Sequence, residues 1–123
     1  MSNVFYAPGE QRARKVNDLF ARIARRYDLI NDLQSFGLHR LWKRRVIRLA
    51  AVKPGQRALD LCCGTGDIAL ALARQGAETI GLDFSENMLA VAERRRPRRA
   101  VDIKFTQGDA QLLSYADESF DIV

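Results

Sequence analysis

The stretch RALDLCCGTGDIALALAR, residues 57–74, restricts the fold more than any other part of the chain. An apolar run over 57–63 leads into a turn that contains Gly64 and Gly66, and an apolar pattern of helical period follows from Asp67 to Arg74. We interpret the first run as a buried strand and the second as a helix. A strand that passes through glycines directly into a helix is typical of parallel α/β sheets that hold a ligand at the turn.

The segments after this turn continue the same alternation. Ser85 is a good N-cap, and Pro97 stops the helix that Ser85 begins. We therefore expect a strand over 78–83, a helix over 85–96, a third strand over 101–106 and the start of a fourth over 120–123. This order predicts the α/β class: N-terminal helices, then the first half of a Rossmann-like parallel sheet that stops within its fourth strand.

The N-terminal part has two helical patterns, from Val16 to Tyr27 and from Leu38 to Ala50, after a loose lead-in over residues 1–11. Pro54 and Gly55 end the second pattern. We expect a helical region over 1–52 and a sheet region over 53–123. Tyr27 and Trp42 fall on the apolar faces of their helices, so we expect both to pack in the core.

Charge divides the chain at about the same place. Residues 1–57 hold 13 Lys or Arg against 4 Asp or Glu, whereas residues 58–123 hold 7 against 11. The basic residues recur at helical intervals, and the run over 94–99 suits a helix C-terminus, so we expect solvated helix faces and no nucleic-acid partner. No uncharged run approaches the ~20 residues that cross a bilayer, which favours a cytoplasmic protein.

Cys62 and Cys63 are the only cysteines. Neighbouring Cα atoms lie about 3.8 Å apart, which is too close for an unstrained disulfide. No second cysteine pair suggests a metal site. We expect two small buried thiols and no bound metal.

The glycine turn fits two kinds of ligand. Gly64 to Ala69 matches the G-x-G-x-x-G/A fingerprint, with Asp83 as the acid that follows, which is one argument for an NAD(P)-binding oxidoreductase. Against this, the strand ends and the turn bring four carboxylates to one crevice, and no Lys or Arg lies within the turn. A pyrophosphate would be repelled there, whereas a cationic ligand with ribose hydroxyls would be attracted. S-adenosylmethionine is such a ligand; the four acids are Asp60, Asp67, Asp83 and Asp109.

The turn resembles the cofactor site of class I methyltransferases. The stretch RYDLINDLQSFGLHRLWKRRV, residues 26–46, closely resembles the signature of the ubiquinone/menaquinone biosynthesis C-methyltransferases of the UbiE/MenG type. The resemblance implies C-methylation of a prenylated quinol, with the helical region as a cap on the substrate side.

The resemblance also implies roles for single residues. It places Thr65 against the cofactor, Asp83 on the ribose hydroxyls, and Asp109 and Ala110 beside the adenine. His39 is the only histidine, and because histidine is a common general acid or base it is the one candidate catalytic residue. The full predicted cofactor set is Asp60, Gly64, Thr65, Gly66, Asp83, Asp109 and Ala110.

The family fold that the chain resembles has seven strands, and only three and the start of a fourth are recognisable here. We therefore expect a fragment that is inactive alone, and a non-catalytic cofactor-binding fragment is a further alternative. An incompletely paired sheet favours self-association. The basic helices favour peripheral contact with an anionic membrane surface.

Overall fold

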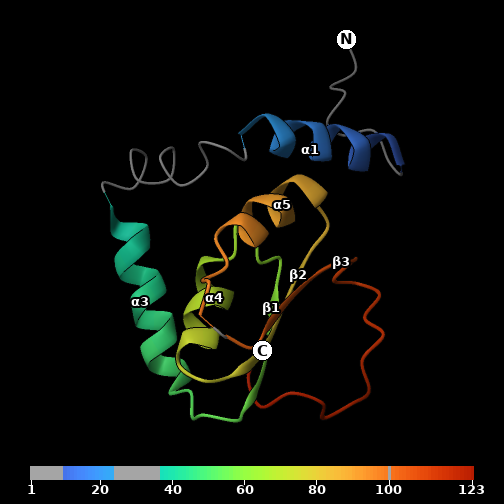
Figure 1. The fold of residues 1–123 in the computed structure, drawn as a ribbon. Coiled ribbons are helices and arrows are strands. Elements are labelled where there is room, and N and C mark those ends of the chain that lie inside the picture. Colours follow the sequence, from blue (N-terminus) through green and yellow to red (C-terminus); the bar gives the residue numbers. More distant parts are fainter. Residues whose placement is uncertain (1–9, 24–36, 100) are drawn as a thin grey trace.

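The computed structural model describes residues 10–23, 37–99 and 101–123. Within these residues, two helices precede a strict alternation of strands and helices (Figure 1). The predicted α/β class is confirmed. The elements are α1 (Glu10–Ile23), α3 (Leu38–Ala50), β1 (Arg57–Leu61), α4 (Asp67–Arg74), β2 (Glu78–Asp83), α5 (Glu86–Arg94) and β3 (Ile103–Gln107).

The three strands form one parallel sheet in the order β1-β2-β3. Asp60 of β1 pairs with Gly81 of β2, and Asp83 at the end of β2 pairs with Gln107 at the end of β3. The carboxyl ends of the strands therefore share one edge, which is where open α/β sheets bind ligands. The predicted fourth strand is represented by an isolated parallel bridge between Ala58 and Ile122.

Local sequence signals account for the boundaries of α4 and α5. Gly66 caps α4 with φ 85°, and a Cβ atom there would lie 3.0 Å from a ring carbon of Phe105, so glycine is required twice over. The Ser85 hydroxyl accepts a hydrogen bond from the Met88 amide at 3.3 Å, which confirms the predicted N-cap. The bounds of α4 and β2 agree with the sequence prediction, whereas α5, β1 and β3 differ from it by one or two residues.

Small apolar side chains fill the space between the sheet and the helices. Ala58 and Ala69 have no exposed surface, and Leu70 is 1% exposed. One cluster joins α3 and α4 to β1, and a second joins α4 to β3. Alanines along α4 let this helix lie close to the strands, which fixes where its N-terminus points.

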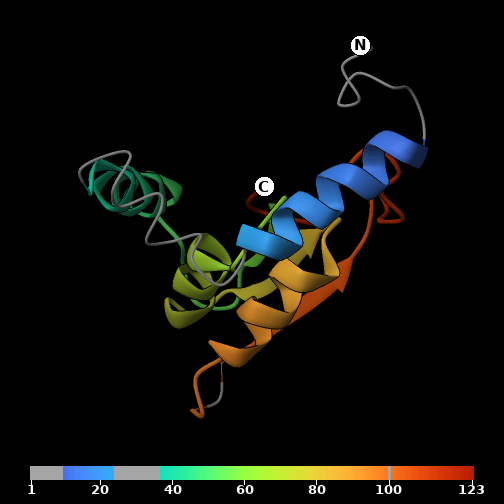
Figure 2. The same ribbon diagram turned by 90° about the horizontal axis from the view of Figure 1, so that it is seen from above.

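The two N-terminal helices lie against different parts of this layer. Helix α3 packs beside α4, and α1 packs against α5 (Figures 1 and 2). In both views α1 runs over the end of the layer, and α3 flanks it. No helix within the described ranges is long and apolar enough to span a membrane.

Two expectations about these helices need correction. Helix α1 begins at Glu10, six residues before the predicted start, and the predicted extension to Tyr27 lies outside the described residues. Trp42 is 62% exposed and does not pack in the core, because α3 turns Ile47 toward α4 and its other apolar face away from the sheet. The exposed apolar residues of α3 are Leu38, Leu41, Trp42, Val46 and Leu49.

Candidate functional site

Asp83 holds two turns together at the carboxyl edge of the sheet. Its Oδ2 accepts a hydrogen bond from the Gly64 amide at 2.8 Å, and its Oδ1 accepts one from the Ser85 amide at 2.8 Å. Each carboxylate oxygen keeps further acceptor capacity. Two neighbouring oxygens fixed in this way suit the two hydroxyls of a vicinal diol.

The turn after β1 departs from its predicted form at Cys62. Cys62 is exposed and has φ 57°, in the left-handed region, so the expectation of a buried thiol is wrong for this residue. The chain must reverse between β1 and α4 within a few residues, and Gly64 shares this backbone conformation with φ 56°. A side chain in this conformation costs roughly 1–2 kcal/mol.

A cavity of about 320 Å³ lies at this edge. Its volume falls within the range of about 300–1,000 Å³ that is typical of ligand pockets. Helix α1 contributes Val16 and Asn17, the β1–α4 turn contributes Cys62 and Gly64, and residues 83–85 with Met88 complete the lining. No Lys or Arg is among these lining residues of the described chain, so the cavity has no cation to hold a phosphate.

Asp60, near the end of β1, is partly buried and lies close enough to Asp83 for the charges of the two carboxylates to interact. Burial raises the pKa of its carboxyl to about 6; the backbone amide of Ala69 lowers it, the charge of Asp83 raises it further, and Lys43 lowers it. A cation brought beside Asp60 would stabilise the ionised form of its carboxyl.

Cys63 is half-buried and not suited to nucleophilic chemistry. Burial raises the pKa of its thiol to about 12, and the charges of Asp60 and Asp83 add to the effect. The thiol is therefore neutral at physiological pH, and it contributes packing beside Phe105 in the second core cluster.

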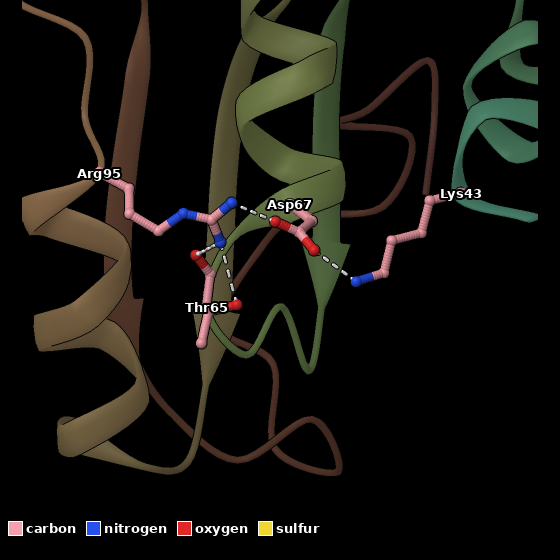
Figure 3. A network of polar contacts seen from close by, with 4 residues as sticks. All are labelled: Lys43, Thr65, Asp67 and Arg95. Carbon is pink, nitrogen blue, oxygen red and sulfur yellow. Dashed lines mark hydrogen bonds and ion pairs between the residues drawn. The ribbon is translucent and has the colours of Figure 1, made fainter. Parts of the chain in front are cut away.

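Asp67, in the first turn of α4, binds two cations from distant parts of the chain (Figure 3). Lys43 of α3 and Arg95 at the end of α5 each contact one of its carboxylate oxygens. Arg95 also donates to the Thr65 carbonyl at 2.9 Å and to the Thr65 hydroxyl at 3.1 Å. The cluster of Lys43, Thr65, Asp67 and Arg95 thus joins α3, α4 and the end of α5. It holds the glycine turn at Thr65, whereas Asp83 holds the same turn at Gly64.

The cations decide the protonation state of Asp67. Burial alone would raise its pKa, but the hydrogen bonds and charges of Lys43 and Arg95 outweigh burial and hold the pKa of this carboxyl below its usual value. The predicted picture of four uncompensated carboxylates is therefore wrong for Asp67. Of the other three, Asp83 lines the 320 Å³ cavity, and Asp60 interacts with the charge of Asp83.

His39, the candidate catalytic residue, does not line the 320 Å³ cavity. It lines a larger cavity of about 770 Å³ between α3 and α4, together with Lys43 and Asp67. This cavity is strongly basic, and its further cationic lining residues are Arg40, Arg44, Arg48, Arg74 and Arg95.

The remaining predicted site residues are distributed as follows. Thr65 is 3% exposed, and its hydroxyl is directed to Arg95. Asp109 is exposed and its Oδ1 accepts a hydrogen bond from the Gln111 amide at 2.8 Å, while the adjacent Ala110 is half-buried. Of the predicted cofactor residues, the structure brings Gly64 and Asp83 into one cavity lining. The others do not line this cavity: Asp60, Thr65, Gly66, Asp109 and Ala110.

Sequence reasoning missed the contributions of Asn17, Lys43 and Arg95 to this region. Asn17 was detectable in principle, because it is a polar residue four positions before Ala21 and therefore on the same helical face. The contacts of Lys43 and Arg95 with Asp67 had no local signal, since 24 and 28 residues separate the partners.

Comparison with known proteins gives consistent relatives. Residues 8–123 match the model of the ubiE/COQ5 methyltransferase family. A demethylmenaquinone methyltransferase from Lactobacillus johnsonii is 45% identical over 115 residues, which cover 89% of this chain and 47% of the relative. A ubiquinone/menaquinone biosynthesis C-methyltransferase from Azotobacter vinelandii is 42% identical over 121 residues, which cover 94% of this chain and 48% of the relative.

Among solved structures, the YcgJ protein from Bacillus subtilis is similar with a TM-score of 0.60 and 34% identity, over 65% of this chain and 35% of that one. The chain spans about half the length of the curated relatives that it matches.

The Asp67 cluster gives a prediction for stability. Asp67→Asn removes the charge that holds Lys43 and Arg95, and we expect a loss of about 1–2 kcal/mol in the free energy of unfolding, since the cluster is partly exposed. Urea unfolding measures this loss.

Glu93→Gln is the matched control, because Glu93 and Arg96 form an exposed ion pair one helical turn apart at 3.0 Å. We expect a loss below about 0.5 kcal/mol for the control. Equal losses in the two variants would contradict a structural role for the Asp67 cluster.

Proposed function

Because the chain belongs to the ubiE/COQ5 methyltransferase family, we propose that it binds S-adenosylmethionine at the carboxyl edge of its sheet and serves the C-methylation of a prenylated quinol. The observation that carries the proposal is Asp83. Its two carboxylate oxygens are fixed by the Gly64 and Ser85 amides beside a cavity whose lining includes no Lys or Arg from the described part of the chain. This arrangement suits a ribose diol and disfavours a pyrophosphate.

The substrate part of the proposal rests on the relatives. The relatives from Lactobacillus johnsonii and Azotobacter vinelandii are named for menaquinone and ubiquinone biosynthesis, and they match nearly the whole of this chain. A demethylated menaquinol or a 2-polyprenyl-6-methoxy-1,4-benzoquinol is the proposed methyl acceptor. We propose the helical region over 1–52 as the cap on the substrate side, with His39 as a candidate catalytic residue.

S-adenosylmethionine supplies a methyl group on a sulfonium, which is a good leaving group, so the chain itself has to bind and orient. Asp83 would hold the ribose, and the ionised form of Asp60 would favour the positive charge of the ligand. Thr65 and Gly66 would keep the turn in place rather than react, because Arg95 binds Thr65 and Phe105 packs against Gly66. Asp109 and Ala110 are proposed for the adenine side.

The first test is binding of S-adenosylhomocysteine by calorimetry. Asp83→Ala removes the two oxygens proposed for the ribose, and we expect a loss of about 1.5–3 kcal/mol in the free energy of binding, since hydrogen bonds to a charged group are lost. Glu78→Ala is the control, because Glu78 is an exposed carboxylate at the opposite end of the same strand.

We expect no measurable binding of NAD in the same experiment. Tight binding of NAD without binding of S-adenosylhomocysteine would overturn the proposed function in favour of a dinucleotide-dependent enzyme.

The state of Asp60 gives a pH dependence. A pKa of about 6 lies above the ordinary value of about 3.9, so the carboxyl gains a proton as the pH falls through 6. A cationic ligand prefers the ionised form, and binding of S-adenosylmethionine should therefore weaken about tenfold from pH 7 to pH 5. Calorimetry at the two values measures this change.

Asp60→Asn should flatten the pH profile, and the exposed Asp102→Asn should leave it as in the unsubstituted chain. A profile that Asp60→Asn does not alter would show that Asp60 does not act on the ligand.

We also propose that α3 contacts an anionic membrane surface. Its exposed apolar face includes Trp42 and Leu49. The same helix carries three of the arginines that line the larger cavity, Arg40, Arg44 and Arg48. An exposed apolar stripe flanked by cations is the pattern of interfacial helices, and each Lys or Arg near such a surface contributes about 1 kcal/mol. A membrane-bound quinol would be reached from the same surface.

Trp42 is the only tryptophan, so its fluorescence reports on this contact directly. With vesicles that contain anionic lipid we expect a blue shift that high salt reverses, and none with neutral vesicles. Leu49→Ser should weaken the shift, and Leu112→Ser, at an exposed leucine outside α3, should not. A response that ignores both lipid charge and salt would contradict the proposal.

Self-association is the second contact that we propose. Among the described residues, no full strand pairs with the outer edge of β1; only the short segment near Ile122 does, through one isolated bridge and a few hydrogen bonds to Arg57 and Leu59. Light scattering would show it as a mass that rises with concentration, and a constant monomer mass would exclude it.

A further inference from the structure

Helix α1 forms one wall of the 320 Å³ cavity at the carboxyl edge of the sheet. Val16 and Asn17 contribute to this wall, although they lie 47 or more residues before Gly64 in the chain. Figures 1 and 2 show α1 lying against α5, the helix whose N-cap, Ser85, is two residues after Asp83. Helix α1 is therefore placed to cover a ligand held by Asp83.

Asn17 has an unmet hydrogen-bonding group in this wall. Its side-chain oxygen is buried and has no hydrogen-bond partner among the residues that the structure describes. Buried polar atoms of folded proteins nearly always have a partner, so an exception beside a cavity calls for a ligand or water as the missing donor. The oxygen can only accept a hydrogen bond, which restricts the partner to a donor group.

The chemistry of the cavity agrees with a ligand that donates. Asp83 on the same lining offers acceptor oxygens as well, and Val16, Phe84 and Met88 supply apolar surface. A nucleoside that carries hydroxyl and ammonium groups satisfies acceptors on more than one side. An anion finds no positively charged side chain among these lining residues.

We propose that Asn17 is a cofactor-binding residue whose carboxamide oxygen accepts a hydrogen bond from a hydroxyl or ammonium group of S-adenosylmethionine. The inference rests on the proposed function and extends it: the cofactor site includes α1, and binding couples α1 to the sheet. Helix α1 is then a wall of the cofactor site as well as part of the substrate-side cap.

The test uses the chain with three single substitutions. Asn17→Leu keeps the approximate shape and removes the acceptor, Asn17→Asp keeps an acceptor, and Asp18→Leu makes the same kind of change at the exposed neighbouring position. We expect about tenfold weaker binding of S-adenosylhomocysteine for Asn17→Leu. Asn17→Asp should bind within about threefold of the unsubstituted chain, and Asp18→Leu should bind as the unsubstituted chain does.

Thermal unfolding without ligand separates binding from folding. The midpoint for Asn17→Leu should not fall below that of the unsubstituted chain, because the substitution removes a buried polar atom that has no partner within the described residues. A further readout is amide hydrogen exchange in α1, which should slow when S-adenosylhomocysteine is added to the unsubstituted chain.

A second ligand identifies the donor group. 5′-Methylthioadenosine keeps the ribose and lacks the amino-acid group. If Asn17→Leu weakens binding of both ligands, the donor lies on the nucleoside; if it weakens only S-adenosylhomocysteine, the donor is the ammonium. Either result supports the inference.

Equal affinities of Asn17→Leu and the unsubstituted chain for both ligands, with unchanged hydrogen exchange in α1, would overturn the inference and leave the proposed function intact. Failure of the unsubstituted chain to bind either ligand would overturn the proposed function, and the inference with it.

Discussion

The pair of hydrogen bonds that Asp83 accepts from Gly64 and Ser85 is the interaction on which the site depends. One bond reaches the turn after β1 and the other reaches the start of α5, so a single carboxylate joins two successive strand–helix connections. The parallel register brings these connections to the same edge, and the side chain then fixes their relative position. A carboxylate held in this way is oriented before any ligand arrives, which lowers the entropic cost of binding.

The cluster around Asp67 complements this arrangement with charge. Its carboxylate brings a cation from α3 and another from the end of α5 to the first turn of α4. Acidic residues are favourable at a helix N-terminus, and here the same acid also fixes Arg95 against Thr65. The glycine turn is thus held at Gly64 by Asp83 and at Thr65 by Arg95, so its shape does not rely on the flexible glycines alone. Lys43 and Arg95 contact Asp67. Among the described residues that line the cavity beside Asp83, that carboxylate is the only charged group.

Local signals predicted the sheet region well. A short apolar run that ends in Asp83, a serine N-cap and a glycine turn each specify a boundary through the backbone of a few neighbouring residues. The predictions that were wrong concern properties that depend on contacts between distant parts of the chain. The apolar period of α3 predicted a buried face but did not indicate what covers it, and Trp42 is exposed. Asp67 was predicted to be an uncompensated carboxylate, because Lys43 and Arg95 are distant in sequence and approach it only in the folded chain. Cys62 adopts the left-handed conformation that a sequence reader expects of glycine.

Amide chemical shifts on addition of S-adenosylhomocysteine test the central claim, that the Asp83-linked edge is the ligand site, most directly. We expect the amide resonances of Gly64 and Ser85 to move together and more than any others in the sheet region, because these amides donate hydrogen bonds to the Asp83 carboxylate that would receive the ribose. Amides at the opposite end of the sheet, such as that of Glu78, should stay in place. Shifts confined to the cavity between α3 and α4, around His39 and Lys43, with Gly64 and Ser85 unmoved, would contradict it.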